Sequence, residues 1–184
     1  MSKVYVFLAE GFEEIEGLTV VDLLRRAKID TEMVSVMEGR QITGSHGIKV
    51  TADSMFADVD FADADVLVLP GGMPGTLNLE ANELLMSQVD AFYAQGKLLA
   101  AICAAPQVFG AQGVLEGKKA TIYPSMEGCL KGAEPQDEIV VVDVKIITSM
   151  GPATAMPFAL KLIEVLKGAE ASEAVASGLL WNRL

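Results

Sequence analysis

Cys103 is the residue of this sequence best placed to act as a nucleophile. It directly follows the apolar run Lys97–Ile102 and precedes a segment with a helical pattern. Small residues at 101 and 105 match the glycine positions of the strand-turn-helix elbow that presents nucleophiles in hydrolases. Pro106 suits a first helical turn, so we expect the positive end of the helix dipole to lower the pKa of Cys103. The alternative is a buried cysteine that acts as a small hydrophobe, which the elbow context disfavours.

Glu16 is the carboxyl group expected to serve this thiol. Positions 16, 20, 23 and 27 share one helical face, and the other three are apolar: Val20, Leu23 and Ala27. Burial on such a stripe raises the pKa of a carboxyl group, which can then donate a hydrogen bond to a thiolate or transfer protons. For Glu13 and Glu14, in the first turn of the same helix, a simple interaction with the helix dipole is favoured.

A glycine-rich turn at Leu69–Gly75 supports the same chemistry. It lacks the lysine and the spacing of a phosphate-binding loop. Paired glycines free backbone N–H groups, which together with the amide of Ala104 could form an oxyanion hole. The alternative, a tight turn that needs a positive φ angle, explains one glycine more easily than the whole cluster.

The remaining chemically active residues are poorer candidates. His46 is the only histidine and lies in a Gly-Ser-His-Gly turn, where an exposed residue without a catalytic role is expected. Cys129 is either a resolving thiol or, as the favoured interpretation, a packed cysteine. The cysteines and the histidine fit no zinc spacing, so no metal site is predicted.

Alternating elements predict a parallel α/β sheet that must position these residues. The strands expected from apolar runs are 4–8, 31–36, 66–69, 97–102, 119–123, 139–142 and 145–148, and a polar hairpin carries the histidine turn. The expected helices are 13–26, 77–95, 104–112, 158–167 and 171–180. Apolar strands separated by helices are typical of a sheet covered on both faces, and ligands bind where such strands end. The relevant turns therefore follow Leu8, Leu69, Ile102, Tyr123 and Thr148.

Length and composition narrow the class of protein. The 184 residues are 51% hydrophobic and contain no linker, which predicts one domain over residues 1–184. A net charge of −11 would repel a nucleic acid backbone. The sequence has neither a membrane-spanning run nor the apolar segment of a signal peptide, so a cytoplasmic protein is expected.

Four motifs resemble the ThiJ/PfpI superfamily, and most closely its parkinsonism-associated deglycase branch, which includes bacterial members. They occur in order over nearly the whole chain: Leu8-Ala9-Glu10-Gly11-Phe12-Glu13-Glu14-Ile15-Glu16, Val66-Leu67-Val68-Leu69-Pro70-Gly71-Gly72, Ala100-Ala101-Ile102-Cys103-Ala104-Ala105-Pro106 and Thr148-Ser149-Met150-Gly151-Pro152-Ala153-Thr154. The resemblance implies a flavodoxin-like three-layer α/β/α sandwich with a mostly parallel sheet. It also implies a homodimer that uses no cofactor.

The resemblance assigns roles to individual residues. Cys103 matches the reactive elbow cysteine, and Glu16 matches the carboxyl group bonded to it. Gly72 and Ala104 match the backbone donors beside the sulfur. The other matches are pocket residues and dimer contacts: Gly71, Tyr123, Gly151 and Pro152 for the pocket, and Arg26 and His46 for the dimer.

Two departures from the family pattern argue against a Cys–His peptidase. Tyr123 stands where many relatives carry a histidine near the cysteine, and tyrosine is a poor base at neutral pH. Ala104 stands where the protease-like branch carries a histidine. The burden of proton transfer therefore falls on Glu16.

Two functions follow from these residues. The first is a cofactor-free glyoxalase III or protein deglycase that acts on reactive aldehydes such as methylglyoxal and on glycated protein, in oxidative or carbonyl stress. The alternative is a non-enzymatic redox sensor or holdase chaperone that uses oxidation of Cys103. A flavin or phosphate carrier is disfavoured because three acidic residues crowd the first turn: Glu10, Glu13 and Glu14.

Overall fold

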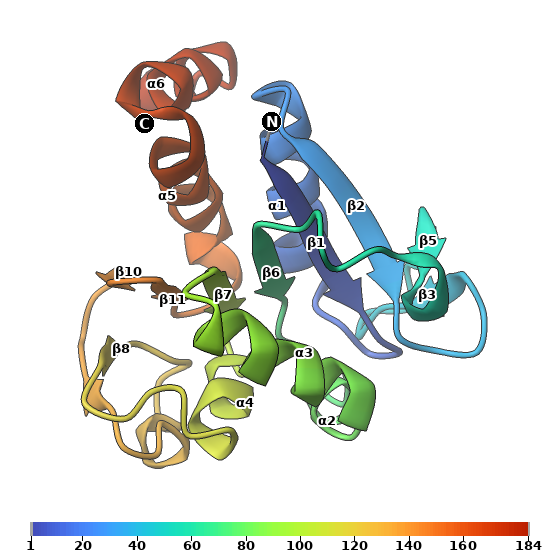
Figure 1. Ribbon diagram of the computed structural model, residues 1–184. Coiled ribbons are helices and arrows are strands. Elements are labelled where there is room, and N and C mark those ends of the chain that lie inside the picture. Colours follow the sequence, from blue (N-terminus) through green and yellow to red (C-terminus); the bar gives the residue numbers. More distant parts are fainter. Residues whose placement is uncertain (1, 184) are drawn as a thin grey trace.

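A computed structural model describes residues 2–183, which form a seven-stranded sheet between two layers of helices (Figure 1). The strands are, in spatial order, β10 (Val140–Asp143), β11 (Ile146–Ser149), β7 (Leu98–Ile102), β6 (Val66–Leu69), β1 (Lys3–Leu8), β2 (Asp30–Ser35) and β5 (Ser54–Met55). Neighbouring strands of this sheet pair in parallel except β10 with β11. The predicted mostly parallel α/β fold is confirmed.

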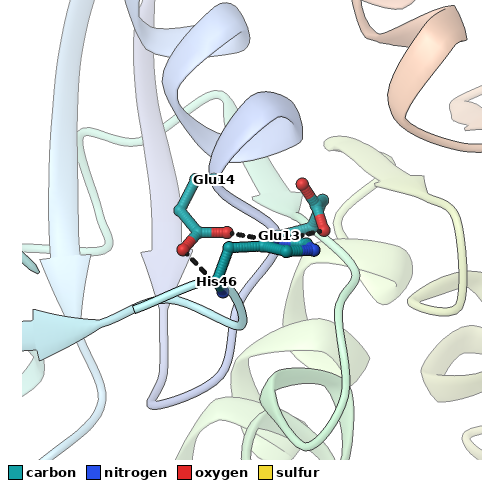
Figure 2. A group of neighbouring side chains, drawn as sticks. All are labelled: Glu13, Glu14 and His46. Atoms are coloured by element: carbon teal, nitrogen blue, oxygen red, sulfur yellow. Dashed lines mark hydrogen bonds and ion pairs between the residues drawn. The ribbon is translucent and has the colours of Figure 1, made fainter. Parts of the chain in front are cut away.

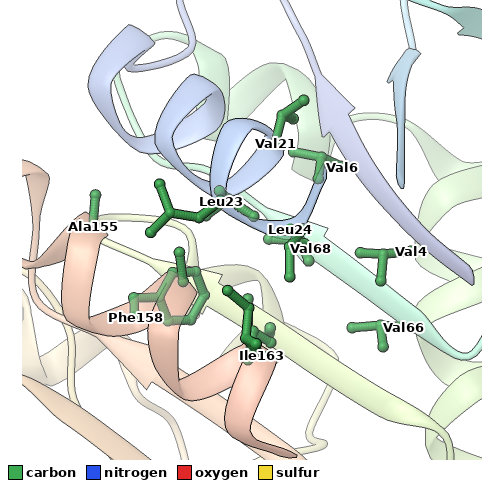
Figure 3. Close-up of a cluster of buried hydrophobic side chains, with 14 of the residues drawn as sticks. Val4, Val6, Val21, Leu23, Leu24, Val66, Val68, Ala155, Phe158 and Ile163 are labelled. Carbon is green, nitrogen blue, oxygen red and sulfur yellow. The ribbon is translucent and has the colours of Figure 1, made fainter. Parts of the chain in front are cut away.

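Alternate residues of the central strands face two separate cores. On one face Val4, Val6 and Leu8 pack with apolar residues of α1 (Glu14–Arg26) and α5 (Ala155–Lys167), and α6 (Ala169–Gly178) lies against α5 (Figure 3). On the other face Tyr5 and Phe7 pack with α2 (Gly75–Glu80), α3 (Glu83–Ala94) and α4 (Pro106–Ala111). Strands buried on both faces explain the continuous apolar runs of the sequence.

The strand order brings three turns together at one edge of the sheet. The chain passes from β1 to β2 on one side and later places β6 on the other side of β1. This reversal is a topological switch point, where parallel sheets leave a crevice beyond the carboxyl ends of the strands. The turns after β1, β6 and β7 all open into this region. The turns after β6 and β7 carry Gly71 and Cys103, and Glu16 lies in the first turn of α1, which follows the turn after β1.

The expected long helix 77–95 is wrong, because two helices occupy this segment. The Asn82 side chain accepts a hydrogen bond from the backbone N–H of Leu85 at 2.9 Å, and this cap starts α3. Asn82 itself has an extended backbone, with φ −84° and ψ 97°. Such a local bond between side chain and backbone competes with a continuous helix.

The expected strand 119–123 is also largely wrong. Only β8 (Lys119–Ala120) forms, and it pairs with β9 (Glu134–Pro135) outside the main sheet. The next backbone donors find other partners. The N–H of Thr121 bonds to the Thr148 hydroxyl at 2.9 Å, and the N–H of Tyr123 bonds to the Cys103 carbonyl at 2.9 Å.

The histidine turn joins the predicted hairpin, which is formed by β3 (Gln41–Thr43) and β4 (Lys49–Thr51). Short 3₁₀ segments complete the elements at 56–58, 127–129, 152–154 and 181–183. Among residues 2–183, each helix is too short or too polar to cross a membrane.

Candidate active site

Cys103 adopts the elbow geometry that its sequence context predicts. Its φ angle is +63°, in the left-handed region that residues other than glycine seldom occupy. Two backbone hydrogen bonds hold this conformation: the N–H of Cys103 donates to the Ser149 carbonyl at 3.0 Å, and its carbonyl accepts from Tyr123. The surrounding strands and loop thus stabilise a strained turn that presents the thiol, which is partly exposed.

Glu16 lies completely buried beside this turn. Its Oε2 atom accepts a hydrogen bond from the backbone N–H of Gly71 at 2.8 Å. Its Oε1 atom is also buried and meets no partner in hydrogen-bond geometry among residues 2–183. A carboxyl group with one satisfied and one free oxygen can hold its proton on the free oxygen.

Gly71 is the point at which Cys103 and Glu16 converge. A Cβ atom at Gly71 would lie 2.6 Å from the Cβ atom of Cys103 and 2.8 Å from Oε2 of Glu16. No side chain fits between them, so glycine is required at this position. Cys103 and Glu16 thus lie side by side, and their joint role in catalysis stays a prediction.

The electrostatics of the pair differ from the expectation for the thiol. Burial raises the pKa of Glu16 to about 7, although interactions with Gly71 and Cys103 lower it. Burial and the adjacent Glu16 carboxylate raise the pKa of Cys103 to about 12, whereas the backbone N–H groups of Ala104 and Gly72 lower it less. The prediction of a lowered Cys103 pKa is therefore wrong. Because the two groups interact, the pair loses one proton near neutral pH and retains the other.

A cavity of about 260 Å³ opens beside the sulfur. Its lining residues are Gly72, Met73, Cys103, Ala104, Tyr123 and Met126. Gly72, Ala104 and Tyr123, which the family resemblance assigns to the site, are thus among the lining residues, and their roles stay predictions. Met73 and Met126 could not be predicted as lining residues, because they belong to turns whose path no sequence pattern defines.

The other expected pocket residues lie behind this cavity or next to it. Gly71 packs behind Cys103, as described above. A Cβ atom at Gly151 would lie 3.3 Å from the Tyr123 ring, and Pro152 begins the adjoining 3₁₀ segment. The loop at 151–152 therefore supports Tyr123, and direct contact of Gly151 or Pro152 with a ligand stays a prediction.

His46 joins two glutamates at the start of α1 (Figure 2). The buried Glu14 carboxylate accepts hydrogen bonds from the backbone N–H groups of His46 at 2.8 Å and Ile48 at 3.3 Å. Its Oε2 lies 3.0 Å from Nδ1 of His46, and an oxygen of Glu13 lies 3.4 Å from the same nitrogen. Beyond any interaction with the helix dipole, Glu14 thus anchors the hairpin turn, a role that the sequence analysis missed. The ligand atoms of Glu13, Glu14 and His46 lie within 4.8 Å of one another. Each already has a hydrogen-bond partner: Glu13 accepts from the Ile15 N–H and the Ser45 hydroxyl, and Glu14 pairs with His46.

We expect replacement of Glu14 by glutamine to destabilise the protein at neutral pH. Burial by itself raises the pKa of Glu14, but hydrogen bonds from the His46 side chain and from backbone N–H groups lower it to about 2. The ionised group therefore stabilises the fold above pH 4.5, and this contribution is lost as the pH falls from 4.5 towards 2. Urea unfolding at pH 7 should show a loss of about 1–3 kcal/mol that shrinks at pH 3.

Glu83→Gln is the matched control for this prediction. Glu83 also lies in the first turn of a helix, but it is exposed. Equal losses of stability in the two variants would mean that Glu14 interacts only with the helix dipole.

The two other singled-out residues lie away from the cavity. Arg26, near the end of α1, pairs with Asp22 at 2.8 Å, and both side chains are about half exposed. Cys129 is a free cysteine in the 3₁₀ segment 127–129. Contacts of Arg26 and His46 with a second subunit remain predictions.

Residues 2–165 match the DJ-1/PfpI family, and this match includes every residue of the site described above. The chain belongs to this family. Family membership confirms the resemblance drawn from the four sequence motifs. The chain also spans about 41% of the length of Arabidopsis thaliana protein DJ-1 homolog B, with 39% identity over 97% of its own length.

Two further relatives match this chain over nearly the whole length of both proteins. Drosophila melanogaster protein dj-1beta is 40% identical over 183 residues, which is 98% of both chains. The structure of oxidized Toxoplasma gondii DJ-1 superposes with a TM-score of 0.94, with 39% identity over 98% of both chains.

Relatives with enzyme names also match. The deglycase TK1284 of Thermococcus kodakarensis is 32% identical over 90% of this chain and 99% of its own. The glutathione-independent glyoxalase DJ-1 of Schizosaccharomyces pombe is 32% identical over 97% of this chain and 98% of its own. Relatives of this chain thus include proteins named for two enzyme activities, a deglycase and a glyoxalase.

Proposed function

We propose that this protein is a cysteine-dependent, cofactor-free enzyme that converts reactive aldehydes such as methylglyoxal, and their adducts with protein, into hydroxy acids. The convergence of Cys103 and Glu16 at Gly71, at the edge of a cavity, is the observation that carries the proposal. The enzyme names of the two relatives support the same class of substrate.

The first step uses the pair in its singly protonated form. In this form the proton resides mainly on the Cys103 sulfur, which has the higher pKa of the pair. When the proton moves to Glu16, the sulfur becomes a thiolate and attacks the aldehyde carbon of methylglyoxal. A C–S bond forms, and the electron pair of the carbonyl bond moves to its oxygen. The N–H groups of Gly72 and Ala104 stabilise this alkoxide, which takes the proton from Glu16 to give a hemithioacetal.

The second step is a proton transfer within the bound substrate. The Glu16 carboxylate removes the proton from the carbon attached to sulfur, and the electron pair moves to the neighbouring carbonyl oxygen to give an enediolate. Glu16 then returns its proton to the neighbouring carbon, while the hydroxyl proton on the first carbon passes to the enediolate oxygen. The first carbon is oxidised to a thioester and the second is reduced to an alcohol, so no external oxidant is needed. Water then cleaves the thioester, which releases lactate and restores Cys103.

A protein adduct enters the same sequence of steps. In an aminocarbinol formed with a protein amine, the sulfur displaces the amine, which leaves with the Glu16 proton. The hemithioacetal that results is identical to the one formed from free methylglyoxal. The pair therefore supports both glyoxalase and deglycase chemistry.

The experiment is a lactate assay with purified protein and methylglyoxal, without glutathione or any added cofactor. We expect lactate to form well above the rate in buffer, and Cys129→Ser to retain this activity because Cys129 is not part of the cavity. Consumption of methylglyoxal without lactate would mean that the thiol only forms adducts, and the proposal would be wrong.

Oxidation of Cys103 is the second candidate function. The observation that favours it is the set of groups around the sulfur: two backbone N–H donors and a carboxyl group with a free oxygen, which together suit an oxidised sulfur. Such a redox sensor or holdase needs no turnover of aldehydes. A homodimer and a cytoplasmic location complete the proposal and rest on the sequence.

A further inference from the structure

The cavity beside Cys103 has an apolar wall. Three larger side chains line it beyond the elbow: Met73, Tyr123 and Met126. Their only polar side-chain atom is the Tyr123 hydroxyl oxygen. None of the six lining residues carries a charge at neutral pH while the Cys103 thiol is protonated. Methionine is flexible and polarizable, so Met73 and Met126 can fit around apolar groups of different shapes.

Two glutamates lie next to residues that line the cavity. Glu16 lies behind Cys103, and a Cβ atom at Gly72 would lie 2.4 Å from the backbone nitrogen of Glu13. The charge of Glu13 already raises the pKa of Glu16, which shows that the carboxylates here act on one another. A substrate carboxylate would lose water in this cavity and meet no cation among its lining residues.

We propose that this cavity selects 2-oxoaldehydes whose second carbon carries an uncharged apolar group and excludes those with a carboxylate, with Met73 and Met126 as the residues that determine specificity. This inference rests on the proposed function, since it concerns the group attached to the aldehyde that Cys103 attacks. It adds a choice of substituent that the Cys103–Glu16 pair does not make.

Phenylglyoxal and 4-carboxyphenylglyoxal are the matched probes, because they differ only by a carboxylate far from the reacting carbon. We expect kcat/KM for hydroxy acid formation to favour phenylglyoxal at least about tenfold, mainly through KM. Met126→Lys should reduce this preference at least about tenfold, and Met126→Leu should keep it. A change in thiol reactivity caused by the new lysine affects both substrates alike and cancels in the ratio.

Leu84→Lys controls for the added charge, since Leu84 is exposed on α3 and does not line the cavity. It should leave the substrate ratio unchanged. An equal shift of the ratio in Leu84→Lys and Met126→Lys would overturn the inference. A wild-type ratio near one would also overturn it, and the glyoxalase proposal would stand.

Alkylation of Cys103 tests the cavity without turnover. Neutral iodoacetamide and anionic iodoacetate form the same kind of bond with the sulfur, and mass spectrometry can follow both at Cys103. We expect Met126→Lys to lower the ratio of the two rates several-fold relative to wild type. If no hydroxy acid forms from any aldehyde but this ratio shifts, the proposed function fails and the cavity preference holds. An unchanged ratio would overturn the preference.

Discussion

Replacing Cys103 with serine is expected to reduce lactate formation from methylglyoxal to the rate without protein, a loss of at least about 1000-fold. A serine hydroxyl needs a general base to become a nucleophile, and this site offers no histidine. Ala104 follows Cys103 directly, and His46 pairs with Glu14 instead. Glu16 would have to activate the hydroxyl alone, although a carboxylate is a much weaker base than an alkoxide.

Stability and a second thiol variant complete this test. Serine is close in size to cysteine, so the urea midpoint of Cys103→Ser should stay near that of wild type. Cys129→Ser should keep full activity. Equal lactate rates in wild type and Cys103→Ser would remove the thiol from the mechanism.

The same comparison separates the enzyme from the redox sensor. If wild type is selectively oxidised at Cys103 by peroxide but forms no more lactate than Cys103→Ser, the alternative function is supported and the enzyme proposal is wrong. If wild type forms lactate and Cys103→Ser does not, the thiol serves catalysis. The two functions thus make opposite predictions for one pair of proteins.

The sheet could be predicted because its strands are short apolar runs bounded by turns. Val66–Leu69 ends at Pro70, and 97–102 ends at the elbow, so both strands could be placed closely. The division of 77–95 into two helices could not, because it depends on the Asn82 side chain and one N–H group. The strand expected at 119–123 fails for a similar reason, since a distant threonine hydroxyl takes one of its backbone donors.

The site was predictable where it depends on topology. Cys103 and Glu16 follow strands that end at the same edge, so their meeting could be inferred from the order of the elements. The direction of the Cys103 pKa could not, because burial and the Glu16 charge outweigh the N–H groups beside the sulfur. The helix that follows has only six residues and begins three positions later, at Pro106. Contacts such as those of Glu14 with the hairpin depend on side-chain positions that no local pattern specifies.

Glu16→Gln is expected to lower kcat/KM for methylglyoxal about 100- to 1000-fold at pH 7, within the range typical of a general acid and base. In wild type, the pair loses its first proton with a pKa of about 7, so turnover should rise with pH up to about 8 and then level off. Glutamine cannot ionise, so the thiol of the variant must lose its own proton. Burial alone keeps the pKa of that thiol above its usual range, and the rise should move to alkaline pH.

Alkylation by iodoacetamide shows this shift directly, because its rate follows the reactive thiolate. We expect a midpoint near pH 7 in wild type and an alkaline midpoint in Glu16→Gln. The same midpoint in both proteins would mean that Glu16 does not share a proton with Cys103. A purely structural role for Glu16 predicts slower alkylation without a change of midpoint.

The stability of Glu16→Gln should change in the direction opposite to its activity. The pKa of Glu16 is about 7 in the folded protein, against the ordinary value of 4.5 that applies to the unfolded chain. The folded state therefore binds this proton more tightly than the unfolded state. Stability therefore falls as the pH rises from 4.5 to 7, by about 3 kcal/mol from this group. The variant lacks this decline, so urea unfolding should show a flatter pH dependence between 4.5 and 7. If the variant loses activity but not stability at pH 7 and above, Glu16 serves catalysis and lowers the stability of the folded protein.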